Sequence, residues 1–86
     1  MSIKQIKYSR HLIEQIHRRG ITMSEIEDVL NNPQQKVTED GLTVYQKILN
    51  IHEKLYLLRV FVNKLKQPPV AVTVYKTSQI NKYLHL

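Results

Sequence analysis

Cationic and phenolic side chains recur in three apolar runs that lie between residues 42 and 77. The first run carries Tyr45 and Lys47, the second carries Arg59, and the third carries Tyr75. Lysine and arginine stabilise the charge of a phosphate, while lysine and tyrosine exchange protons once their surroundings shift their pKa. This combination of side chains is the strongest indication of function in the sequence.

The runs that must position these groups read LTVYQKILNI, KLYLLRVFVN and PVAVTVYKT. Apolar residues at every second position are typical of strands with one buried face. The connections are too short for parallel crossovers, which predicts antiparallel strands. If aliphatic residues such as Val44 and Leu58 point inward, the four polar side chains share the opposite face. If Lys47, Arg59 and Lys76 were clustered, their positive charge would lower the pKa of Lys47 and Tyr75.

Two helices are predicted before these strands. An apolar stripe begins after Ser9, and Gly20 is placed to end this helix in a left-handed turn. Thr22 and Glu25 have the spacing of a capping box that starts the second helix. Asn31-Asn32-Pro33 then stops it, because the residue before a proline disfavours helix.

The remaining segments complete the predicted architecture. Residues 3–8 alternate weakly, as in a short edge strand, and residues 34–40 indicate a further strand that turns at Asp40-Gly41. Residues 78–86 fit a short helix or a loose tail. We therefore predict one α+β domain over residues 1–86, in which two N-terminal helices pack on one face of a three- to four-stranded antiparallel sheet.

The formal net charge is +6, and the whole surplus lies in the C-terminal part of the chain. Residues 1–53 contain seven Lys or Arg and seven Asp or Glu, whereas residues 54–86 contain six Lys or Arg and no acid. Such a field attracts polyanions, so nucleic acid or an acidic protein is the expected partner. The alternative is that these lysines keep the surface soluble and protect sheet edges from aggregation.

The chain has no cysteine, which excludes disulfides and thiolate metal sites. No apolar run approaches the roughly 20 residues of a membrane span, and MSIKQIKYS lacks the apolar core of a signal peptide. We expect a soluble, cytoplasmic protein without a cofactor or a membrane partner. His11, Glu14 and His17 are spaced by three residues rather than the four typical of helical metal ligands, so no metal site is predicted.

Short motifs along nearly the whole chain resemble those of a known toxin group. They are Tyr8-Ser9-Arg10-His11, Arg19-Gly20-Ile21, Asn32-Pro33, Tyr45-Gln46-Lys47, Leu58-Arg59-Val60 and Val72-Thr73-Val74-Tyr75. With the element order, the size and the basic sheet, they resemble the RelE/ParE superfamily of bacterial type II toxins, including its BrnT-like and MqsR-like relatives. They are also similar to the motifs of an uncharacterised bacterial family that is often grouped with these toxins, although that family favours Ala at Leu12 and Arg at Gln15.

The resemblance implies an RNA-cleaving toxin that acts on free or ribosome-bound mRNA and is inactivated by a small acidic antitoxin. Cleavage without a metal needs a base for the 2′-hydroxyl proton, a cation beside the phosphorane and an acid for the leaving 5′-oxygen. The candidate catalytic residues are Lys47, Arg59, Tyr75 and His11. The candidate RNA-binding residues are Tyr45, Arg19, Lys64, Lys66 and Lys76.

Two other functions stay open, namely a toxin of the same fold that inhibits a protein such as DNA gyrase, and a nucleic-acid-binding module without toxicity. The candidate side chains also have structural interpretations. Tyr45 and Tyr75 are common packing residues of sheets, and Lys47 is an ordinary residue for an exposed strand position. Arg19 complements a helix dipole, and His11 can bond a nearby carbonyl.

Overall fold

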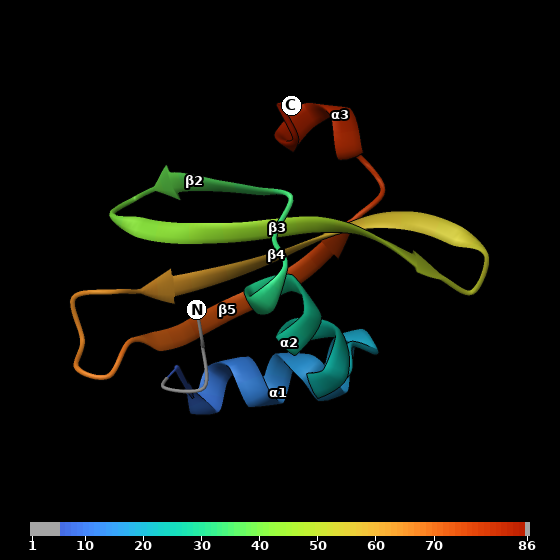
Figure 1. Cartoon of the computed structure of the whole chain (residues 1–86). Coiled ribbons are helices and arrows are strands. Elements are labelled where there is room, and N and C mark those ends of the chain that lie inside the picture. Colours follow the sequence, from blue (N-terminus) through green and yellow to red (C-terminus); the bar gives the residue numbers. More distant parts are fainter. Residues whose placement is uncertain (1–5, 86) are drawn as a thin grey trace.

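The computed structural model describes residues 6–85. The elements are β1 (Lys7–Tyr8), α1 (Arg10–Arg19), α2 (Met23–Asn31), β2 (Gln35–Glu39), β3 (Leu42–Ile51), β4 (Lys54–Asn63), β5 (Val70–Thr77) and α3 (Ile80–Tyr83). The strands form one sheet in the order β1-β5-β4-β3-β2. Helices α1 and α2 cover one face of this sheet, whereas α3 lies on the opposite face (Figure 1). None of the helices within residues 6–85 is long and apolar enough to cross a membrane.

The α+β class and the packing of two N-terminal helices on one sheet face are confirmed. The expected number of strands and the purely antiparallel pairing are wrong, because the sheet has five strands and β1 runs parallel to β5. Helices α1 and α2 lie between β1 and the rest of the sheet in sequence, so the chain has the length that a parallel partner needs. Residues 3–5 of the first predicted strand lie outside the described residues.

Gly20 and the capping box of the second helix act as the sequence predicts. Helix α1 ends at Gly20 with a φ of 64°, and its start is capped by the Ser9 hydroxyl, which accepts the Leu12 amide hydrogen at 3.0 Å. The amide of Thr22 donates to the Glu25 carboxylate at 2.9 Å, and the Glu25 amide donates to the Thr22 hydroxyl at 3.1 Å. The apolar stripes of both helices then pack on the sheet. This core comprises Leu12, Ile16, Ile21, Ile26, Val29, Leu30, Tyr45, Leu58, Val60, Val62, Ala71 and Val74.

Side chains of the first helix close the outer edge of β5, since β1 pairs with only its first two residues. Ser9 Oγ donates to the Val72 carbonyl at 3.2 Å, and Arg19 Nη1 donates to the Val74 carbonyl at 3.0 Å. The Val74 amide donates to Gln15 Oε1 at 3.0 Å. An arginine has no atom that could accept a hydrogen bond from that amide. This contact therefore explains in structural terms why glutamine fits at position 15.

Two hairpins of two-residue turns set the register of the central strands. Asp40-Gly41 joins β2 to β3, and His52-Glu53 joins β3 to β4. All four turn residues have a positive φ, which is the backbone geometry of type I′ turns. Counting back from these turns places Gln46 opposite Gln35 on one side and opposite Arg59 on the other.

Candidate active site around Arg59

The four polar residues expected on one face of the sheet are divided between its two faces. Arg59 pairs with Gln46 on β3 and with Tyr75 on β5, and directly paired residues project to the same side. Tyr45 and Lys47 therefore lie on the side of α1 and α2, and the prediction of one shared face is wrong for them. Apolar residues occur on both sides of β3, so alternation alone did not determine which side faces the helices.

On the face opposite α1 and α2, the Arg59 side chain is held by three polar partners. Its Nε donates to Gln46 Oε1 at 2.8 Å, and its Nη1 donates to the Tyr75 hydroxyl at 2.7 Å. Its Nη2 forms an ion pair with the Glu39 carboxylate. The Arg59 side chain is only 1% exposed, whereas that of Glu39 is 41% exposed. A buried cation thus has a partly accessible acid and a phenol beside it.

The C-terminal segment covers this cluster. The Tyr83 ring lies over the guanidinium, with its centroid 4.4 Å from Arg59 Cζ. Gln46 Nε2 donates to the Tyr83 carbonyl at 2.9 Å and to Gln35 Oε1 at 2.8 Å. Together these contacts place α3 and the residues after it directly on the Arg59 cluster, in agreement with the position of α3 in Figure 1.

Burial and charge determine how the two titratable partners behave. Burial raises the pKa of Tyr75, and this effect outweighs the lowering by the hydrogen bond and charge of Arg59. Tyr75 therefore holds its proton at neutral pH, and the expected lowering of its pKa is wrong. Burial lowers the pKa of Arg59, but the hydrogen bonds and charges of Glu39 and Tyr75 more than offset this and raise it. The guanidinium stays cationic.

The chain matches no protein family model, curated protein or solved structure. The chemistry of the Arg59 cluster is therefore the basis for assigning a function. A guanidinium binds and stabilises a phosphate, a carboxylate accepts a proton, and a neutral phenol donates one. The cluster contains one group for each of these tasks.

The sequence interpretation missed three members of this cluster, namely Glu39, Gln46 and Tyr83. The turn signals contain the information for two of them. A two-residue turn at Asp40-Gly41 places Glu39 on the same side of the sheet as Gln46, and the turn at 52–53 places Gln46 beside Arg59. No comparable sequence signal locates Tyr83, because its position depends on how the C-terminal segment folds back.

The other candidates on the sheet lie on the helix side. Lys47 Nζ bonds both carboxylate oxygens of Asp28 in α2, at 3.0 and 2.9 Å. Lys76 pairs across the sheet with Leu58 and so shares this side. Lys47 and Lys76 therefore do not cluster with Arg59, and the pKa shift that such a cluster would cause has no source here. Tyr45 is 5% exposed and belongs to the core.

The helix and loop candidates are separate from Arg59 as well. His11 is exposed on α1, and Arg19 bonds the edge of β5. Lys64 and Lys66 are exposed in the connection between β4 and β5. Of the four predicted catalytic residues, the structure brings together only Arg59 and Tyr75.

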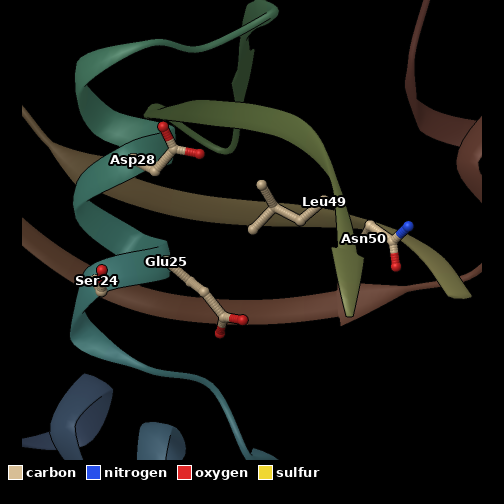
Figure 2. Close-up of a pocket in the computed structure, with 5 residues that line it drawn as sticks. All are labelled: Ser24, Glu25, Asp28, Leu49 and Asn50. Carbon is tan, nitrogen blue, oxygen red and sulfur yellow. The ribbon is translucent and has the colours of Figure 1, made fainter. Parts of the chain in front are cut away.

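A shallow open pocket of about 420 Å³ lies on the helix side of the sheet. Figure 2 shows its lining residues, Ser24, Glu25 and Asp28 from α2 and Leu49 and Asn50 from β3. Its two carboxylates already have partners, since Glu25 caps α2 and Asp28 pairs with Lys47. Within residues 6–85, no three His, Asp or Glu side chains converge in a way that would hold a metal ion.

Proposed function

We propose that this protein is a toxin-type endoribonuclease that cleaves mRNA without a metal, with the Arg59 cluster as its active site. One observation supports this proposal, namely that the Glu39 carboxylate and the neutral Tyr75 phenol both contact the buried Arg59 guanidinium. The sequence resemblance to RelE/ParE-type toxins favours the same chemistry.

In this mechanism Glu39 accepts the proton of the 2′-hydroxyl, whose oxygen attacks the adjacent phosphorus. Arg59 stabilises the negative charge that develops on the phosphorane oxygens. Tyr75 donates its proton to the leaving 5′-oxygen as the P–O bond breaks. The products are a 2′,3′-cyclic phosphate and a 5′-hydroxyl end, and the enzyme finishes with a protonated Glu39 and a deprotonated Tyr75 that exchange protons with water.

Arg59 has enough hydrogen-bond donors to bind a phosphate as well as its three protein partners. A guanidinium has five N–H groups. Among residues 6–85, the bonds to Gln46, Tyr75 and Glu39 use three of these N–H groups. Two N–H groups remain that can donate to phosphate oxygens. The three protein partners also fix the plane of the group, so it is oriented before RNA arrives.

The uneven charge of the chain supports an anionic substrate and an acidic inhibitor. Residues 54–86 contain six Lys or Arg and no acid, so the C-terminal part of the chain favours an anionic partner such as RNA, and Lys82 lies beside the ring that covers Arg59. A small acidic antitoxin is the partner that this charge fits best. Cytoplasmic mRNA, free or on the ribosome, is the proposed substrate.

The test is induced expression of the protein alone, followed by mapping of cellular RNA 5′ ends. Wild type should create new 5′-hydroxyl ends, and Arg59→Met should not. Lys54→Met is the control, because it also replaces one cation of β4 by methionine, but at an exposed position outside the cluster. Circular dichroism checks that each variant is folded, and purified protein should cleave RNA in the presence of EDTA.

Three results would contradict the proposal. They are the absence of new RNA ends despite good soluble expression, cleavage by folded Arg59→Met at the wild-type rate, and loss of cleavage in EDTA. Growth arrest without RNA cleavage would instead indicate a toxin that inhibits a protein target.

A further inference from the structure

We infer that the C-terminal segment, residues 80–85, occupies the place of RNA on the Arg59 cluster and is exchanged for single-stranded RNA on binding. This inference rests on the proposed function, since it names what must leave that site before substrate can enter. Arg59 is 1% exposed with the segment in place, so a phosphate has no access to it. Either the segment moves or Arg59 never contacts a substrate.

The contacts of the segment are those that a nucleotide makes. An aromatic ring, that of Tyr83, lies over the guanidinium at 4.4 Å, as nucleobases stack on arginine in RNA complexes. Gln35 Nε2 donates to the His85 carbonyl at 2.6 Å, and Gln35 Oε1 accepts from the His85 amide at 3.0 Å. A glutamine amide uses the same paired donor and acceptor to bond the edge of a base.

The segment is also weakly attached. Helix α3 has only four residues, none of them is buried, and no side chain caps its first turn. A helix this short is not stable by itself in water, so its contacts with the sheet hold it in place. Segments with few buried apolar contacts open at low free-energy cost.

Charge favours the exchange. Residues 78–85 carry Lys82 and no acidic side chain, so the segment gives Arg59 no negative partner. The Lys82 ammonium lies 5.3 Å from the Tyr83 ring, which places a second cation on the ring that covers Arg59. An RNA phosphate is an anion that satisfies the guanidinium directly, so RNA gains an interaction that the segment lacks.

A single tryptophan can report the exchange, because the chain has none. Tyr83→Trp keeps an aromatic ring over Arg59, and its emission should shift to longer wavelength when the ring is released into water. The probe is a 2′-O-methyl oligoribonucleotide of about ten nucleotides, a length within the usual site size for single strands. It has no free 2′-hydroxyl and stays intact during titration.

Removal of the cover should strengthen binding of the same oligonucleotide. We expect at least about tenfold tighter binding, by fluorescence anisotropy, for a chain that ends at Ser78. Tyr83→Ala is the second variant in case the shortened chain is unfolded, and it should also bind more tightly. Lys54→Ala is the control, and its affinity should not increase.

Unchanged Tyr83→Trp emission at saturation would overturn the inference, as would equal or weaker binding by both uncovered variants or the absence of binding by any form. Cleavage of natural RNA separates the two proposals. Exchange and tighter binding without cleavage would leave the inference standing and reject the nuclease. Cleavage that is unaffected by removal of the segment would support the nuclease and reject the inference that the segment occupies its site.

Discussion

Replacing the carboxylate beside Arg59 by an amide tests both the stability and the proposed chemistry of the cluster. Glu39→Gln keeps the size of the side chain and removes its negative charge. The Arg59 guanidinium would then be buried beside neutral partners only, namely Gln46 and the phenols of Tyr75 and Tyr83. The substitution should therefore destabilise the fold even though Glu39 lies on an edge strand.

The expected loss follows from the two exposures. Breaking a fully buried ion pair costs about 3–5 kcal/mol, and breaking an exposed pair costs about 0–1 kcal/mol. Arg59 is 1% exposed and Glu39 is 41% exposed, so this pair lies between these limits. We expect a loss of about 2 kcal/mol in the free energy of unfolding. For a domain of this size that corresponds to a decrease of about 8–16 °C in Tm.

Urea and thermal unfolding at neutral pH measure this loss. Glu14→Gln, an exposed position of α1, is the matched control and should change stability by less than about 0.5 kcal/mol. Adding Arg59→Met to Glu39→Gln should restore part of the loss, because an apolar side chain leaves no unpaired buried charge. Equal stability of Glu39→Gln and the control would refute the account of the cluster.

The same variant tests the role of Glu39 in cleavage. A general base contributes about 10²–10⁴ in rate, so folded Glu39→Gln should cleave RNA at least about 100-fold more slowly than wild type. Cleavage at the wild-type rate would remove Glu39 from the mechanism while leaving its structural role intact.

Three further predictions follow from other contacts. Lys47→Ala should retain wild-type cleavage, because Lys47 pairs with Asp28 on the sheet face opposite Arg59. It should lose at most about 1 kcal/mol in the free energy of unfolding. Loss of cleavage by the folded variant would place the active site on the helix side. Replacing His52-Glu53 by Asn-Gly should stabilise the protein by about 1 kcal/mol, because φ values of 52° and 66° are strained for histidine and glutamate and relaxed for asparagine and glycine. An unchanged urea midpoint of unfolding would show that the turn is unstrained. The raised pKa of Tyr75 contributes stability that is present below pH 10.0 and is lost as pH rises through the pKa of the folded state. Between neutral pH and a pH above that pKa, the free energy of unfolding in urea should therefore decrease less in Tyr75→Phe than in wild type. Equal decreases in the two proteins would contradict this prediction.

The helices and their limits were predictable because their signals are local. Gly20 and the capping box of Thr22 and Glu25 each act within a few residues and have the predicted geometry, and the Ser9 hydroxyl caps the first helix equally locally. The parallel pairing of β1 depends instead on a contact with Val70 at the far end of the chain. No property of the two-residue strand itself specifies such a partner.

The face of each strand was the step at which the site prediction failed. Tyr45 and Tyr75 are the same residue type, yet the first packs in the core below α1 and α2 and the second bonds Arg59 on the other side. Residue type and alternation are compatible with either orientation when both sides of a strand carry apolar groups. The two-residue turn at 52–53 places Tyr45 and Arg59 on opposite sides, whereas the side of Tyr75 depends on the pairing of β5 with β4, whose register shifts between Phe61 and Val62.

Glu39 can be identified from the sequence as the partner of Arg59. A buried arginine in a strand requires an acid, and residues 54–86 contain none, so the partner of Arg59 must come from the first 53 residues. Four of the seven acids there lie on helices and two in turns, which leaves Glu39 as the acid on a strand. The two hairpin turns then carry its register through Gln46 to Arg59. Charge balance and turn geometry together therefore identify the pair at the centre of the site, which alternation alone does not.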